Sequence, residues 1–181
     1  NPQLSKTLGE IAKDGADALY KGKNAKNIVN EIRKNGGILT VEDFEKYKPV
    51  LRSPIYADTS GFTIVGVPPP SSGGAALIGA VRFLSGYQDP FARAADTLSV
   101  HRMVEAMRHV FAIRMSLSDP SYNGNVTQDA VNDLVRGDYM ESLRVLSRDN
   151  GTLPLSFYGG RKWAQLNDGD ATNKAVDAHE G

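Results

Sequence analysis

The sequence predicts an α/β fold, layered as α+β and rich in helix, from three observations. Apolar residues recur at helical spacing over most of the chain, and an alternating segment at residues 55–67 is interrupted by a turn sequence. Hydrophobic residues make up 40% of the 181 residues and charged residues 23%. This balance is typical of a globular chain with a true core, and the length allows one ordinary domain or a piece of a larger one.

The first part of the chain predicts three helices. Two amphipathic helices are predicted at residues 4–20 and 24–35. Gly15 interrupts the first of them and Gly22 ends it, because glycine is a poor helix former. A short third helix follows Thr40, which together with Asp43 has the spacing of a capping box.

A hairpin and further helices are predicted in the rest of the chain. The strands of the hairpin lie on either side of the turn sequence Asp58-Thr59-Ser60-Gly61. The longest helical pattern runs from Thr97 to Ser116, and Asp119-Pro120 ends it. Shorter helices are predicted at residues 128–134 and 139–148.

The most informative stretch is a run of prolines, serines and glycines that follows the hairpin: Pro68, Pro69, Pro70, Ser71, Ser72, Gly73 and Gly74. Prolines lack a backbone donor and have a fixed φ, so we expect the three prolines to leave the hairpin as a stiff extended arm. We expect one of the serines to cap a buried helix that begins near Gly74, and the glycines to let other backbone approach closely. The run is therefore interpreted as a rigid structural corner.

His101, Glu105 and His109 are four residues apart along the longest predicted helix, so they share one face. Such a face could bind a metal or hold an acid–base pair. The alternative is an ordinary helix in which Glu105 pairs with a neighbouring base: Arg102, Arg108 or His109. We favour this structural interpretation, because two helical turns separate the histidines by about 12 Å, too far to share one ion.

The composition argues against several functions. A net charge of zero argues against a nucleic-acid or anionic-membrane partner, and the absence of cysteine removes disulfides and thiolate metal sites. Neither serine of the proline run has a base and an orienting carboxylate near it in the sequence, and no loop has phosphate-binding spacing. We therefore expect no catalytic residue, metal or cofactor in this chain. Membrane anchoring would have to be supplied upstream, because no apolar run approaches the roughly 20 residues of a membrane span.

The proline-serine-glycine run resembles a signature of the gamma-glutamyltransferase family. Further segments resemble the large subunit of that family, in the same order: Gly36–Phe44 with Tyr47, His101–Arg108, Phe111–Met115 and Asp119-Pro120. The proline run is the specific element, whereas the helices alone would be a weak signal. Ser118 departs from the glycine that is common in the family, which leaves the local turn geometry open.

The resemblance implies the helix-rich portion of an N-terminal-nucleophile hydrolase, an αββα sandwich. It implies that residues 1–181 are the C-terminal part of the large subunit, and that the nucleophile is the threonine beginning a separate small subunit. The sequence Asp177-Ala178-His179-Glu180-Gly181 resembles the one that precedes the self-cleavage point, so Gly181 would be the new C-terminus and 167–181 a mobile tail. The family's catalytic and substrate-binding motifs lie outside this chain, so no residue of the chain is assigned either role.

The implied activity is cleavage of γ-glutamyl amides such as glutathione, with transfer of the γ-glutamyl group to water, amino acids or peptides. The implied location is extracytoplasmic, and two sequons permit glycosylation at Asn125 and Asn150. Two alternatives stay open. One is a related β-lactam side-chain acylase of the same fold, and the other is a non-catalytic helical interaction module. The module would show an exposed apolar strip on the long helix and need no partner chain for solubility.

Overall fold

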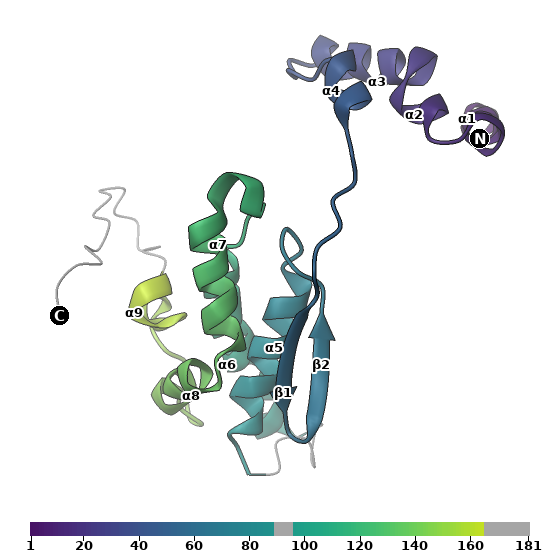
Figure 1. The fold of residues 1–181 in the computed structure, drawn as a ribbon. Helices are drawn as coiled ribbons and strands as arrows, with labels where there is room; N and C mark the ends of the chain where they lie inside the picture. Colours follow the sequence, from purple (N-terminus) through teal and green to yellow (C-terminus); the bar gives the residue numbers. More distant parts are fainter. Residues whose placement is uncertain (89–95, 165–181) are drawn as a thin grey trace. The chain divides into compact units, whose positions relative to one another are not determined.

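The computed structural model describes residues 1–88 and 96–164, which divide into two compact units: Asn1–Leu51 and the residues from Arg52 onward (Figure 1). Each unit has its own buried apolar residues. The fold of the second unit places every feature that bears on function.

The first unit consists of α1 (Pro2–Asp14), α2 (Asp17–Tyr20), α3 (Gly22–Lys34) and α4 (Val41–Lys46). Gly15 separates α1 from α2 with a φ of 70°, which confirms the predicted interruption. Gly22, with a φ of 68°, is the first residue of α3, so it begins a helix as well as stopping one. Both angles lie in the left-handed region, where glycine carries no steric penalty.

Local contacts close the first unit. The Thr40 hydroxyl accepts the Asp43 backbone N–H at 3.3 Å, and the Asp43 carboxylate accepts the Thr40 N–H at 2.7 Å, so the predicted capping box is confirmed. The Tyr20 ring stacks on that of Tyr47 with 5.2 Å between centroids.

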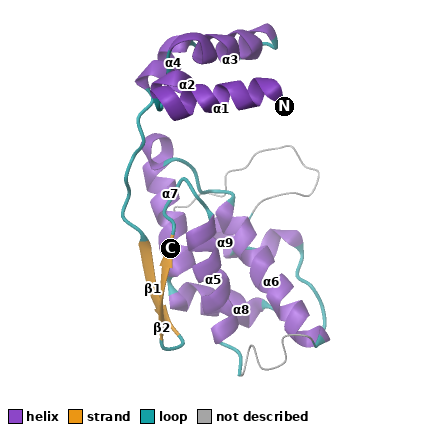
Figure 2. Ribbon diagram, turned by 90° about the vertical axis from the view of Figure 1, so that its right-hand side faces the viewer, coloured by secondary structure: helices purple, strands orange, loops and turns teal. Residues whose placement is uncertain are grey.

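The second unit contains, in chain order, β1 (Ile55–Thr59), β2 (Phe62–Gly66), α5 (Gly73–Ser85), α6 (Thr97–Arg114), α7 (Pro120–Val135), α8 (Gly137–Leu146), the 3₁₀ turn η1 (Leu155–Phe157) and α9 (Gly160–Trp163). Helix α5 contacts both strands and also α6, α7 and α8. Figures 1 and 2 show this central helix with the hairpin beside it. The helix-rich α+β prediction is confirmed.

The hairpin forms around the predicted turn. Strands β1 and β2 pair antiparallel, from Ile55 opposite Gly66 to Thr59 opposite Phe62. The two residues between them, Ser60 and Gly61, have φ values of 51° and 80°. Positive φ at both positions gives the turn a twist that matches that of the paired strands.

Helix α5 is central because its small residues let other helices approach. A Cβ on Gly79 would lie 2.9 Å from Leu134 Cδ2 of α7 and 3.3 Å from Val110 Cγ2 of α6. The missing side chain therefore brings three helices together. The buried core around them consists of Ala75, Phe83, Ala106, Val110, Ile113, Ala130, Val131, Leu134, Met140, Leu143 and Trp163.

Asp119 and Pro120 begin helix α7, in addition to following the end of α6 as predicted. Helix α6 ends at Arg114, and the Asp119 carboxylate accepts the Ser121 N–H at 2.9 Å as the N-cap of α7. Pro120 occupies the first turn, where its missing donor costs nothing. The predicted helix at 128–134 thus begins eight residues earlier, with non-helical backbone at Asn123.

Candidate functional site

The proline run is a turn and not an extended arm, which corrects the prediction. The chain turns at Pro69 and Pro70, and Pro69 is buried. The turn delivers α5 directly against β2, which directly precedes the run along the chain. The expected corner between β2 and α5 is present, but the packing of α5 on β2 forms it and not a stiff extended arm.

Only the second glycine of the run allows a close backbone approach. A Cβ on Gly74 would overlap the backbone N and O of Val67 and lie 2.7 Å from the carbonyl carbon of Gly66. A Cβ on Gly73 would meet nothing closer than the Ser71 hydroxyl at 3.7 Å. The prediction is therefore confirmed for Gly74 and wrong for Gly73.

Of the two serines, Ser71 and not Ser72 bonds a backbone N–H at the start of α5. Ser72 is the N-cap residue of α5 but its side chain caps no backbone N–H. Its hydroxyl instead accepts a hydrogen bond of 2.8 Å from Arg114 Nε at the end of α6. The Ser71 hydroxyl accepts the Gly73 N–H at 3.4 Å. The run is thus tied to α6 by a side chain that sequence spacing could not reveal.

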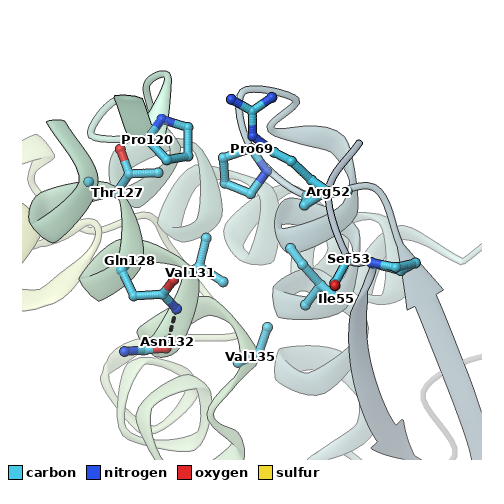
Figure 3. A pocket seen from close by; sticks show the side chains of 13 residues that line it. Arg52, Ser53, Ile55, Pro69, Pro120, Thr127, Gln128, Val131, Asn132 and Val135 are labelled. Atoms are coloured by element: carbon cyan, nitrogen blue, oxygen red, sulfur yellow. Dashed lines mark hydrogen bonds between the residues drawn. The ribbon is translucent and has the colours of Figure 1, made fainter. Parts of the chain in front are cut away.

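A cavity of about 430 Å³ lies between this turn and α7. In Figure 3, Pro69 and Arg52 lie on one side of it and Thr127, Gln128 and Val131 on the other. Arg52 pairs with Asp119 at 3.1 Å, and Gln128 donates to Asn132 at 2.9 Å. The full lining is Arg52, Ser53, Pro54, Ile55, Pro68, Pro69, Pro120, Gly124, Thr127, Gln128, Val131, Asn132 and Val135.

The cavity lining offers no nucleophile with a base beside it. Its lining contains no histidine, and the hydroxyl of Thr127 is buried and held by the Ser118 backbone N–H at 3.1 Å. The turn geometry left open at Ser118 is ordinary. The backbone φ of Ser118 is not positive, so the turn needs no glycine at this position.

The face of α6 that carries His101, Glu105 and His109 holds the segment that follows α8. His101 Nε2 donates to the Arg148 carbonyl at 2.7 Å. Arg102 makes a two-bond pair with the Asp149 carboxylate, at 2.8 and 2.6 Å. The structural interpretation of this face is confirmed, since each of its histidines binds another segment of the chain.

Glu105 is fully buried and is satisfied by the same segment. The Tyr158 hydroxyl lies 2.9 and 2.8 Å from the two Glu105 oxygens, and Arg108 Nη1 lies 3.3 Å from one of them. Tyr158 also accepts the Leu153 N–H at 3.0 Å. Burial, and then the bond to Glu105, raise the pKa of the Tyr158 phenol. Arg108 is among the bases that the sequence offered as partners of Glu105.

His109 and Ser147 form a pair that resembles a catalytic dyad but has the wrong tautomer for one. The Gly159 backbone N–H donates to His109 Nδ1 at 3.1 Å, so the neutral ring carries its proton on Nε2. That Nε2 lies 3.1 Å from the Ser147 hydroxyl and donates to it, so it cannot accept the serine proton. Burial lowers the His109 pKa to about 4.

A second set of contacts holds the last described residues against the helices, and little in the sequence predicted it. Trp163 Nε1 donates to the buried Asp133 carboxylate at 2.8 Å, and Lys162 pairs with the same carboxylate at 2.8 Å. Tyr139 donates to the Gly159 carbonyl at 2.8 Å. A lone tryptophan after the last predicted helix was the one available signal.

The structure describes both predicted glycosylation sites but not the predicted cleavage junction. Asn125 and Asn150 are both exposed, Asn125 on α7 and Asn150 in the turn closed by the Arg148–Gly151 bridge. Gly181 and the predicted tail 167–181 lie outside the described residues. Within residues 1–88 and 96–164, no three His, Cys, Asp or Glu side chains come together as metal ligands.

Comparison with known proteins decides the family. A sequence profile described as gamma-glutamyltranspeptidase matches residues 1–181. The chain belongs to the gamma-glutamyltranspeptidase family. The resemblance read from the proline run is thereby confirmed.

Individual relatives agree with this family assignment. Glutathione hydrolase 2 of Arabidopsis thaliana is 36% identical over 97% of this chain and 30% of its own length. Scoloptoxin SSD14 of Scolopendra dehaani is 37% identical over 98% of this chain and 30% of its own length. The crystal structure of the Helicobacter pylori gamma-glutamyltranspeptidase superposes with a TM-score of 0.76 at 29% identity, covering 94% of this chain and 48% of that one. The expectation of a helix-rich portion of the N-terminal-nucleophile hydrolase fold is confirmed.

The chain spans about a third of the length of these curated relatives. Its described residues contain structural polar networks and a cavity beside the proline run, but no Ser–His or carboxylate arrangement set for catalysis.

Proposed function

We propose that this chain is the C-terminal part of the large subunit of an enzyme that cleaves γ-glutamyl amides such as glutathione. The γ-glutamyl group is transferred to water, amino acids or peptides. The observation that carries the proposal is the family match over residues 1–181, together with 36% identity to a glutathione hydrolase over 97% of the chain.

The role of this chain is that of a scaffold, and the nucleophile is the N-terminal threonine of a separate small subunit. The one hydrogen-bonded Ser–His pair among the described residues supports this division, since the His109 tautomer prevents His109 from activating Ser147. An N-terminal threonine needs no such partner, because its own α-amine, with a pKa of about 8, serves as the base.

We place the self-cleavage junction directly after Gly181, and the protein in an extracytoplasmic compartment. The exposed positions of Asn125 and Asn150 are compatible with glycans at both sites. None of the helices in the described part of the chain is both long enough and apolar enough to cross a bilayer.

The experiment is intact-mass spectrometry of the full-length precursor after purification, followed by a γ-glutamyl anilide assay. We expect two polypeptides, one ending at Gly181 and one beginning with threonine, and anilide release that rises when an amino-acid acceptor is added. The control replaces that threonine with alanine, which should leave one uncut and inactive polypeptide. Two chains without anilide release would reject the substrate class while keeping the processing.

The alternative of a non-catalytic module is separated by solubility. An exposed apolar strip does run along α6, as the module would require. A module would be soluble and folded as residues 1–181 alone. A subunit fragment would be insoluble alone and soluble when co-expressed with its threonine-initiated partner.

A further inference from the structure

His109 joins two positions of one segment to helix α6. The segment consists of residues 147–163, and we call it the latch segment. The His109 ring is buried, and its Nε2 lies 3.1 Å from the Ser147 hydroxyl at the start of the latch segment. Its Nδ1 accepts the Gly159 backbone N–H at 3.1 Å, near the end of that segment. One side chain therefore binds both positions to α6.

The bond to Gly159 exists only while the His109 ring is neutral. The Ser147 hydroxyl donates to the Leu143 carbonyl at 3.3 Å, so it accepts the proton of His109 Nε2. The neutral ring has its one in-plane lone pair on Nδ1, and this lone pair accepts the Gly159 N–H. A second proton has to bind at Nδ1, where it would point at the Gly159 hydrogen. Protonation therefore replaces a hydrogen bond with a contact between two donors.

The packing around Gly159 leaves no room to relieve that contact by a small shift. A Cβ on Gly159 would lie 2.9 Å from Ala112 Cβ of α6 and 3.0 Å from Trp163 Cβ. The Tyr139 hydroxyl, which stays protonated because burial raises its pKa to about 12, donates to the Gly159 carbonyl at 2.8 Å. We therefore expect the backbone at Gly159 to leave α6 when the ring of His109 gains a proton.

Among the described residues, the groups around His109 do not stabilise a second proton on the ring. Glu105 lies one helical turn away, but its two oxygens lie 2.9 and 2.8 Å from the Tyr158 hydroxyl, and Arg108 pairs with one of them. The nearest rings are the uncharged Phe83 of α5, at 5.6 Å, and Tyr158 of the latch segment, at 5.0 Å. Burial accordingly lowers the pKa of His109 to about 4.

The latch segment contributes little to the apolar core of the second unit. Every residue of the buried core cluster except Trp163 belongs to α5, α6, α7 or α8. A segment with few buried apolar contacts opens at a lower free energy than the whole fold. Release of the latch segment therefore costs less than melting the four helices.

We propose that His109 is a proton-operated latch: a proton on Nδ1 releases residues 147–163 from α6, while α5, α6, α7 and α8 stay packed on one another. The proton comes from the solvent, which reaches the ring when the latch segment opens. The inference needs neither the family membership nor the proposed activity.

The sign of the pH dependence follows from the two states of the ring. Its pKa is about 4 when the latch segment is closed and about 6.5 when the ring is exposed, so the open state binds more protons. The ratio of open to closed molecules should rise by up to about tenfold for each pH unit lowered between 6.5 and 4. Between pH 6.5 and 5 alone, the rise should be roughly 15-fold.

The test is hydrogen–deuterium exchange of the full-length protein, followed by mass spectrometry at half-unit pH steps and corrected for the intrinsic exchange rate. We expect the protection factor of peptides from 147–163 to fall roughly 15-fold between pH 6.5 and 5. We also expect it to stay below the protection factor of peptides from α5 and α7 at every pH. The interval from pH 6.5 to 5 decides, because carboxylates with ordinary pKa values of about 4 do not titrate there.

Two histidine variants assign the effect. In His109→Asn, the side-chain oxygen takes the place of Nδ1 as acceptor but binds no proton, so the fall between pH 6.5 and 5 should disappear. Glu105 and Asp149 are unchanged in this variant, so any pH dependence that they cause remains. His101→Asn is the matched control and should keep the fall, because His101 donates its bond to the Arg148 carbonyl and still donates when protonated.

Other results overturn the proposal. An equal fall in the parent and in His109→Asn would show that another group controls the latch segment. Equal protection of 147–163 and of the helices at every pH would show that the segment opens only when the whole unit unfolds. If His109→Asn does not fold, the parent still decides, since unchanged protection of 147–163 between pH 6.5 and 5 would show that the latch does not exist.

Discussion

Gly74 lies so close to the strand before the proline run that any side chain there would overlap backbone. The neighbouring Gly73 has free space around its Cβ position. These two adjacent glycines, which are equivalent in the sequence motif, therefore have different tolerances. Their difference can be measured directly.

We predict that Gly74→Val prevents folding or maturation, whereas Gly73→Val is tolerated. The clash at Gly74 is with backbone of Val67 and Gly66, which cannot move aside without separating α5 from β2. Overpacking of this kind costs about 3 kcal/mol or more. Soluble yield and thermal unfolding check the prediction. A soluble, processed Gly74→Val protein with altered acceptor preference would contradict the structural role.

His109 gives a second prediction at the scale of one residue. Its pKa is about 4 in the folded chain, because the ring is buried, against about 6.5 when unfolded. Between these values the unfolded state binds more protons, so the free energy of unfolding falls as the pH is lowered from 6.5 to 4. The full loss is about 3 kcal/mol, and above pH 6.5 this contribution is constant.

Thermal unfolding at half-unit pH steps measures this dependence. In His109→Asn the side chain does not titrate, so the unfolding free energy should change less steeply between pH 6.5 and 4, although its value is lower throughout. Equal slopes for the two proteins would show that His109 does not remain neutral when folded.

At the scale of elements, the contacts that a helix makes decide whether replacing its glycine with alanine raises or lowers the free energy of unfolding. Glycine in a helix interior costs about 1 kcal/mol relative to alanine, so replacement by alanine should stabilise a helix that has room for the methyl group. Gly9 in α1 has no atom within 4 Å of its Cβ position, whereas Gly79 in α5 would meet the Leu134 carbonyl oxygen at 3.2 Å.

We predict opposite signs for the two alanine variants. Gly9→Ala should raise the free energy of unfolding by about 0.5–1 kcal/mol. Gly79→Ala should lower it by about 1–2 kcal/mol, because separating α5 from α7 costs more than helix propensity returns. Denaturant unfolding of both variants measures the sign of each change in the free energy of unfolding. If both substitutions stabilise the protein, the interface between α5 and α7 can accommodate a methyl group and the prediction is wrong.

At the scale of the whole molecule, two polar networks attach the last described segment, around Tyr158 and Trp163, to the helical core. Glu105 and His109 bind the segment around Tyr158, and Asp133 of α7 binds Trp163. Trp163 is the only tryptophan of the 181 residues, so its emission reports on this attachment.

We predict that Tyr158→Phe lowers the free energy of unfolding by about 3 kcal/mol, since it removes a hydrogen bond from a buried carboxylate. Trp163 emission should move to longer wavelength before the helices melt, because the segment is released first. Tyr122→Phe, at a position 92% exposed, is the control and should stay within about 0.5 kcal/mol of the parent. Coincident loss of emission and helix in Tyr158→Phe would mean that the segment and core unfold as one unit.

Local chemistry was predictable where it depends on neighbours in the chain. The capping box at Thr40, the break at Gly15 and the hairpin turn at Ser60-Gly61 each follow from the backbone preferences of two or three adjacent residues. The family followed from the same kind of information, because a run of prolines, serines and glycines is specific as a string of residues.

Which side of α6 is buried could not be read in this way. Apolar spacing placed the helix, but the buried side carries Glu105 and His109, whose partners lie up to 53 residues away. Likewise, the turn at Pro69 and Pro70 and the bond from Arg114 to Ser72 depend on segments that meet only after folding.

The sequence by itself thus determined the hairpin, the family and the place of most helices of this protein, since each depends on local preferences or on an ordered motif. Only the tertiary structure decided that Gly74 and not Gly73 lies against backbone, that the His109–Ser147 pair has the tautomer opposite to that of a catalytic dyad, and that α6 exposes apolar side chains on its outer side. The physical reason is the same in each case: burial, tautomer and close approach are set by atoms from distant parts of the chain.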